Sequence, residues 1–124
     1  MRKVFCFGNE YFDGDEIAKE LSKKIKNSDF EFIIAQSPTE ILNIEKELII
    51  LDVAKGIKKV QLLTDTSKLE YFHSTSVHDL DLSFFLKLMQ ETGKINDVKI
   101  IALPFGNKDY EYLKNEVEKI LKKI

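Results

Sequence analysis

The sequence contains a single cysteine among its 124 residues, and this scarcity limits the chemistry that the chain can carry. One thiol, Cys6, excludes an internal disulfide and a cysteine-rich zinc site. Cys6 lies inside the apolar run 4–7, and free cysteines in such runs are usually buried. We therefore predict an inert core thiol rather than a nucleophile.

The chain also lacks a strong net charge of either sign. Its formal charge is −2 and its pI is about 5.7, so it has no global basic field that would attract nucleic acid or anionic lipid. The N-terminal apolar run is too short for a signal peptide or a membrane span. We expect a cytoplasmic protein with neither nucleic acid nor a membrane as its partner.

Two common families of functional motif are missing as well. Gly8 and Gly14 are not part of a Gly-x-Gly-x-x-Gly fingerprint, and no Gly-Lys-Ser or Gly-Lys-Thr phosphate cradle is present. No Gly-x-Ser-x-Gly elbow supplies a serine nucleophile. Nucleotide binding and serine hydrolase chemistry are therefore disfavoured.

What is present describes a soluble globular protein. Hydrophobic residues make up 44% and charged residues 32% of the chain, and its length suits one domain, 1–124, with a continuous core. Apolar runs alternate with segments of helical period. Strands are predicted at 4–7, 30–35, 47–51, 60–64 and 98–103, and helices at 15–26, between Ser37 and Glu47, from about 78 to 92 and at 110–124.

This alternation predicts an α/β fold. We expect a single three-layer domain with a twisted, mostly parallel sheet of about five strands and helices on both faces. In such a sheet the carboxyl ends of the parallel strands face one crevice, which is where ligands bind. Sheet topology alone also leaves open a small flavodoxin-like signalling or cofactor domain.

Three metal-capable side chains stand where an apolar strand gives way to a loop or helix. Asp15 follows the first strand, Asp52 directly follows the strand 47–51, and His78 precedes a helix. Although they are far apart in sequence, they can converge at the carboxyl ends of the strands. Two carboxylates and one imidazole would form a site for a divalent metal ion.

Each of these residues also has a simpler interpretation. Asp15 suits the N-cap of the first helix, Asp52 suits an acceptor of backbone hydrogen bonds in a turn, and His78 suits a solvent-facing helix start. His73 lies five residues before His78, but no helical or strand period would hold this pair as a zinc site. Asp79 and Asp81 either orient His78 or complement the helix N-terminus.

Three motifs that contain these residues resemble those of the hydrogenase maturation proteases. The first strand runs into Gly8-Asn9 and then Gly14-Asp15, where the family has a pair of acids. The middle strand ends in Asp52-Val53-Ala54, where the family has Asp followed by a small residue. A loop with Thr75 and Ser76 leads into His78 and a helix, as in the third motif of the family. The resemblance spans nearly the whole chain.

The resemblance implies an endopeptidase that recognises nickel in an immature nickel-iron hydrogenase large subunit and cleaves off its C-terminal extension. Asp15, Asp52 and His78 would be both the metal ligands and the catalytic residues. The nickel would arrive with the substrate, so no cofactor is permanently bound, although cadmium or zinc can take its place in crystals. The partner would be the hydrogenase large-subunit precursor. The attacking nucleophile stays unassigned.

Departures from the family pattern indicate a divergent, short member. Gly14 replaces the first acid of the pair, the stretch 35–39 lacks the glycines usual after the second strand, and Phe105 follows Pro104 where the family often has an acid. These departures leave open an alternative of another class, a non-catalytic metal- or partner-binding protein of the same fold.

Overall fold

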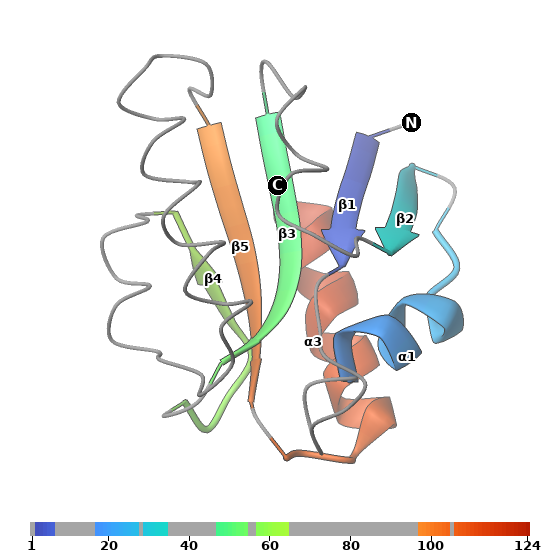
Figure 1. Cartoon of the computed structure of the whole chain (residues 1–124), viewed down its shortest axis with the longest axis vertical. Helices are drawn as coiled ribbons and strands as arrows, with labels where there is room; N and C mark the ends of the chain where they lie inside the picture. The colour runs from blue at the N-terminus through green and yellow to red at the C-terminus, as the bar shows by residue number, and fades with distance from the viewer. Residues whose placement is uncertain are drawn as a thin grey trace.

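The computed structural model describes residues 2–6, 17–27, 29–34, 47–54, 57–64, 97–104 and 106–124. The elements in these ranges are β1 (Arg2–Cys6), α1 (Ile17–Lys24), β2 (Phe30–Ile34), β3 (Glu47–Ala54), β4 (Gln61–Leu63), β5 (Asp97–Pro104) and α3 (Tyr110–Lys123) (Figure 1). Each coincides with a strand or helix predicted from the sequence. The helices predicted between Ser37 and Glu47 and from about 78 to 92 lie outside the described residues.

The five strands form one sheet in the order β2-β1-β3-β5-β4. β1 pairs in parallel with β2 and β3, β3 pairs in parallel with β5, and β4 runs antiparallel to β5. The predicted α/β class and the mostly parallel, five-stranded sheet are confirmed. The non-consecutive order means that chain crossovers, rather than hairpins, connect the parallel strands.

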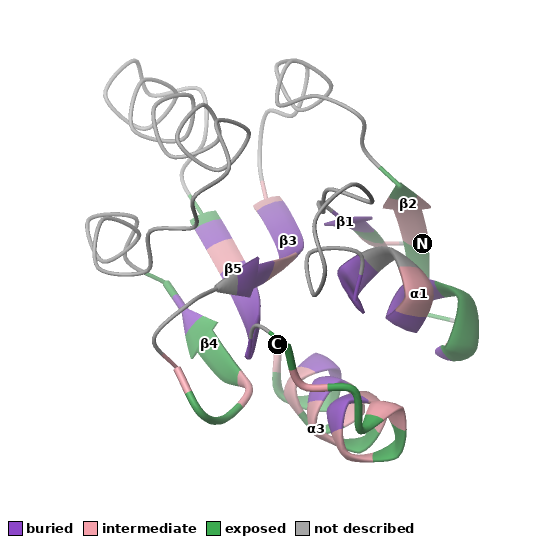
Figure 2. Cartoon of the chain, turned by 60° about the horizontal axis from the view of Figure 1, so that its bottom comes forward, coloured by how far each residue is buried: buried purple, intermediate pink, exposed green. Residues whose placement is uncertain are grey.

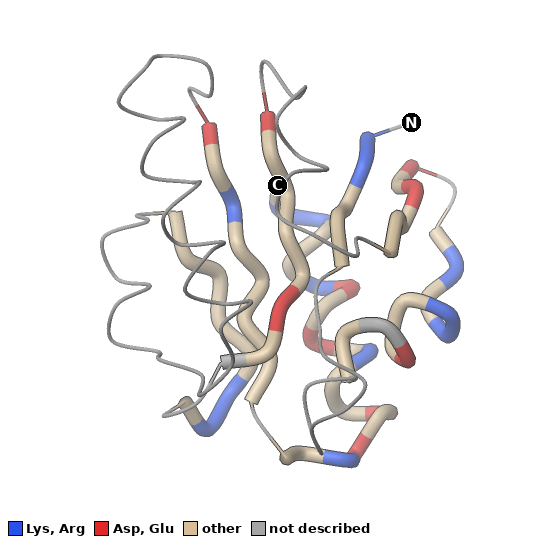
Figure 3. Tube along the Cα trace, viewed as in Figure 1, with Lys and Arg blue, Asp and Glu red and all other residues tan. Residues whose placement is uncertain are grey.

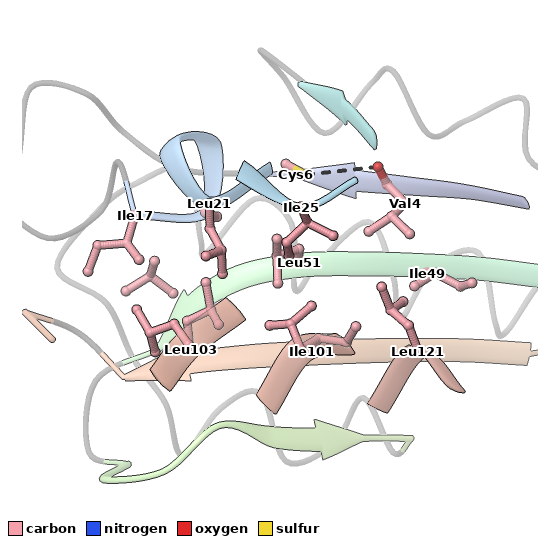
Figure 4. Close-up of a cluster of buried hydrophobic side chains, with 14 of the residues drawn as sticks. Val4, Cys6, Ile17, Leu21, Ile25, Ile49, Leu51, Ile101, Leu103 and Leu121 are labelled. Carbon is pink, nitrogen blue, oxygen red and sulfur yellow. Dashed lines mark hydrogen bonds between the residues drawn. The ribbon is translucent and has the colours of Figure 1, made fainter. Parts of the chain in front are cut away.

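The two central strands, β3 and β5, are apolar along almost their whole length because both of their faces are buried. Side chains alternate between the faces. One face packs against α1 and α3, which lie on the same side of the sheet (Figure 2). The core between the sheet and these helices consists of Val4, Cys6, Ile17, Ala18, Leu21, Ile25, Phe30, Ile49, Leu51, Val53, Ile101, Leu103, Leu113, Val117 and Leu121 (Figure 4).

Both described helices are amphipathic, and each contributes one apolar stripe to this core. In α3, Leu113, Val117 and Leu121 are buried, while Ile120 is half-buried at the edge of the core. Asp109 caps the helix, because its Oδ1 accepts a hydrogen bond from the amide of Tyr112 at 3.2 Å. Neither helix of the described part is long and apolar enough to cross a membrane.

Candidate functional site

The parallel strands give the sheet two chemically different edges. We call the edge where β1, β3 and β5 end, at Cys6, Ala54 and Pro104, the carboxyl rim, and the edge where they begin the amino rim. Parallel α/β sheets bind their ligands at the carboxyl rim. The predicted site residues must therefore be sought there.

Asp52 lies near the carboxyl rim, but within a strand. The sequence predicted that the strand ends at Leu51, whereas β3 continues to Ala54. The prediction of the strand end was wrong because β5 extends equally far, and Asp52 pairs with Ala102 inside this ladder. On the other side, the last pair of β1 with β3 among the described residues is Cys6 with Leu51. Asp52 is thus one residue beyond this last described pair.

The carboxylate of Asp52 is held by the main chain. Its Oδ1 accepts a hydrogen bond from the amide of Val53 at 2.8 Å, and the residue is half-buried. This is the backbone-acceptor role that the simpler interpretation predicted, now found in a strand instead of a turn. Such a bond restricts the orientation of the carboxylate, and metal-binding carboxylates in proteins are commonly fixed by hydrogen bonds in this way.

Beside Asp52, the last residue of β1 is a fully buried thiol. Burial is the main reason why the pKa of Cys6 rises to about 12; a hydrogen bond with Ser22 opposes the rise, and the negative charge of Asp52 adds to it. The Sγ atom also lies 3.9 Å from the carbonyl oxygen of Val4 (Figure 4). The predicted burial of Cys6 is confirmed, and the raised pKa disfavours the thiolate form that a nucleophile or a metal ligand requires.

Ser22 is a residue of this region that the sequence reasoning missed. It is a buried polar residue of α1, with 9% of its surface exposed, and it reaches Cys6 from the apolar side of the helix. Helical spacing contained the signal, because Ser22 follows the buried Ala18 by four residues and precedes the buried Ile25 by three.

Asp15 and His78, the two other predicted ligands, lie outside the described residues. Within the described ranges, no three His, Cys, Asp or Glu side chains form a group able to hold a metal ion. In the sequence, the nearest described residues on either side of Asp15 are Cys6, at the carboxyl rim, and Ile17, the first residue of α1. Helix α1 contacts β1 and β3. The meeting of the three side chains stays a prediction.

Charges are arranged differently at the two rims (Figure 3). At the amino rim, Arg2 and Lys99 both bind Glu47: Arg2 Nε donates to Oε2 at 3.0 Å, and Lys99 Nζ lies 2.9 Å from Oε1. Lys99 also pairs with Asp97 at 2.6 Å. The hydrogen bond from Arg2 is the main reason why the pKa of Glu47 falls below its usual range.

The two positive and two negative charges of this cluster, on Arg2, Lys99, Glu47 and Asp97, therefore neutralise one another. At the other end of the sheet, the exposed Lys58 and Lys59 precede β4 and make no ion pair with another described residue.

No protein-family profile matches the sequence, and no curated protein matches it at a significant level. Solved structures do match. An endopeptidase from Escherichia coli, determined in solution, superposes with a TM-score of 0.71 at 17% identity, covering 99% of this chain and 93% of that one. The hydrogenase maturating endopeptidase HybD from E. coli gives 0.69 at 16% identity with the same coverage. A hydrogenase 3 maturation protease gives 0.66 at 15% identity, covering 96% of this chain and 88% of that one.

These likenesses extend over nearly the whole of both chains and agree with the resemblance of the three motifs. The protein has the fold of the hydrogenase maturation endopeptidases.

Proposed function

We propose that the protein is an endopeptidase that removes the C-terminal extension from an immature nickel-iron hydrogenase large subunit after recognising the nickel that the subunit already carries. Asp52 would bind that metal together with Asp15 and His78. The observation that carries the proposal is the position of Asp52, which stands at the carboxyl rim of a sheet with the maturation endopeptidase fold, inside the motif that resembles that of the family.

The chemistry of the three side chains supports this assignment. Two carboxylates and an imidazole suit a borderline divalent ion such as nickel, and they leave coordination positions for the ligands that the substrate brings. The hydrogen bond from Val53 to Asp52 Oδ1 holds the carboxylate in one orientation before the substrate arrives. A metal ion bound there could polarise the scissile carbonyl or activate water, and both routes are compatible with these residues.

The proposal is tested by replacing Asp52 with Asn. Asn keeps a side-chain oxygen for the amide of Val53, so the fold should persist, but it removes the negative charge that binds the metal. Cleavage of nickel-loaded precursor should fall by at least about 100-fold, because losing a direct ligand should cost more than the roughly 10- to 100-fold loss seen for residues that only orient one. The measurement is the mass of the large subunit after incubation with the protein.

Asp29→Asn is the matched control. Asp29 is exposed and precedes β2, at the opposite end of the sheet, so the same chemical change there should leave cleavage unchanged. Normal cleavage by the Asp52→Asn variant would refute the assignment of Asp52. Tight binding of the precursor by the unaltered protein, with no change in the mass of the subunit, would instead identify the non-catalytic binding protein.

A further inference from the structure

The residue that pairs with Asp52 across the sheet has a very small side chain. Asp52 of β3 pairs with Ala102 of β5, and these strands run side by side (Figure 1). Neighbouring strands lie about 4.8 Å apart, and directly paired residues point their side chains to the same face of the sheet. On the β1 side, the described pairing ends at Cys6 and Leu51. Among the described residues, Ala102 is therefore the neighbour that stands level with Asp52.

The face that Asp52 and Ala102 share is the one opposite to α1 and α3. Leu51, Val53 and Ile101, which alternate with them along the strands, belong to the core beneath those helices. The carboxylate of Asp52 and the methyl group of Ala102 thus lie outside that core, side by side near the carboxyl rim.

The preceding pairs on the same face of β3 and β5 are large and apolar. Ile50 pairs with Ile100, and Leu48 pairs with Val98. All four side chains are at most 2% exposed, and Ala102 is equally buried at 2%. Its small size is therefore not the result of an exposed position, where side chains of many sizes are tolerated.

The small side chain of Ala102 leaves space for the carboxylate of Asp52. Protein interiors are close-packed, so the size of one buried side chain limits the space that its neighbour can occupy. Ala102 is covered, whereas Asp52 is half-buried and has an open side. A larger side chain at 102 would press against its buried surroundings and against the carboxylate, and the half-buried carboxylate is the group that can move.

The position of the carboxylate matters because Asp52 has a defined orientation. The amide of Val53 donates to Oδ1 at 2.8 Å, and a displaced carboxylate would lose this bond or turn its oxygen atoms in another direction. Reacting groups tolerate little displacement, since a misplacement of about 1 Å can cost about 100-fold in rate. A change of size at 102 should therefore reach the site through Asp52.

We infer that Ala102 is a positioning residue of the candidate metal site: its methyl side chain, paired with Asp52, leaves the space in which the carboxylate keeps its metal-binding orientation. This inference rests on the proposed function, because Ala102 acts through Asp52. It adds a limit on size, since the position beside Asp52 accepts no side chain larger than a methyl group without loss of metal recognition.

The test compares the binding of nickel-loaded and nickel-free precursor by size variants, measured by rapid mixing before cleavage. The unaltered protein should bind the loaded form more tightly, because Asp52 supplies a ligand to the nickel. Ala102→Val should weaken this preference about 10- to 100-fold, the loss expected for a residue that orients a metal ligand. Ala102→Gly keeps the space and should keep the preference within about 2-fold. Both variants should lower stability, Val by overpacking and Gly by added backbone freedom, so destabilisation alone cannot separate them.

Val98→Ile is the matched control for overpacking. Val98 lies on the same strand and face as Ala102 and is also 2% exposed, but it pairs with Leu48, four residues before Asp52. Val98→Ile should leave the preference for the loaded form unchanged. The route through Asp52 is tested by a double variant: Ala102→Val added to Asp52→Asn should weaken the preference no further than Asp52→Asn alone.

Four results would overturn the inference while cleavage by the unaltered protein upholds the proposed function. These are a full preference in Ala102→Val, a lost preference in Ala102→Gly, an equal loss in Val98→Ile, and a further loss when Ala102→Val is added to Asp52→Asn. The proposed function fails in a different way. If the unaltered protein prefers the loaded precursor and Ala102→Val does not, yet the mass of the subunit never changes, the positioning role stands and the peptidase proposal fails.

Discussion

Cys6 and Asp52 lie on neighbouring strands, and Cys6 pairs with Leu51, the residue before Asp52. Their surroundings nevertheless make one an inert thiol and the other a candidate metal ligand. Cys6 is the last residue of β1 and points into the core under α1, where no water stabilises a thiolate. Asp52 belongs to the other face of the sheet and is half-buried near the carboxyl rim. The alternation of side chains along a strand separates the inert group from the candidate ligand.

The burial of Cys6 leads to a prediction about alkaline pH. A thiol whose pKa is raised in the folded state stabilises the fold fully below the pKa of the unfolded chain, about 8.5, and this contribution is lost as the pH rises from there toward about 12. The free energy of unfolding, measured by urea titration, should fall over this range. Cys6→Ala should cost about 1 kcal/mol at pH 7 and should lack the alkaline loss that depends on the thiol.

Reactivity provides the independent check of Cys6. Iodoacetamide should leave the native protein unmodified at pH 8 and should label it fully in denaturing urea, because the single thiol becomes accessible only on unfolding. Rapid labelling of the native protein would contradict the buried, protonated state.

At the scale of elements, β3 shows how a neighbouring strand overrides a local signal. The acid at Asp52 suggests the end of an apolar strand, but pairing with β5 continues through Val53 opposite Leu103 and Ala54 opposite Pro104. The hydrogen bonds between β3 and β5 extend the strand past Asp52, and the sequence of β3 alone does not predict them. Helix α3 behaves differently, since its boundaries follow from its own sequence.

The N-cap of α3 gives a prediction at this scale. Asp109 satisfies the amide of Tyr112, which would otherwise lack a helical partner, so Asp109→Ala should lower the free energy of unfolding by about 1 kcal/mol. Asp109→Ser keeps an oxygen in the cap and should remain close to the unaltered protein. Equal unfolding midpoints for the Ala and Ser variants in urea would show that the cap does not stabilise the helix.

At the scale of the whole molecule, the ion pairs of the amino rim connect parts of the chain that are distant in sequence. Arg2 begins β1, Glu47 begins β3, and Lys99 lies near the start of β5. Arg2 also donates through Nη1 to the carbonyl oxygen of Ile124 at 2.6 Å, and its guanidinium lies 5.0 Å from the ring centre of Phe30. One side chain thus links β1, β2, β3 and the end of α3.

This network predicts a stability that depends on acid pH. Because the pKa of Glu47 is lowered in the fold, its contribution is present above the usual glutamate pKa of about 4.3 and is lost as the pH falls below that value. Glu47→Gln should cost about 1 kcal/mol at pH 7, a modest value because the pair is partly exposed to solvent, and should cost less at pH 3.

Glu118→Gln is the control for this measurement, since Glu118 makes no ion pair with another described residue. Its unfolding free energy should track that of the unaltered protein at both pH values. If Glu47→Gln lowers the free energy of unfolding equally at pH 7 and pH 3, the substitution removes packing rather than a charge interaction.

The sequence by itself determined where the strands and described helices lie, that Cys6 is buried, and that Asp52 stands near the end of a central strand. These properties follow from hydrophobic period and local turn or cap chemistry, which short segments contain in full. Only the tertiary structure decided that Asp52 lies inside β3, that Ser22 meets Cys6, that Arg2, Glu47 and Lys99 form a network, and that Ala102 stands level with Asp52. Each of these depends on which strand lies beside which and in what register, and that choice is made by burial across the whole sheet rather than by any one segment.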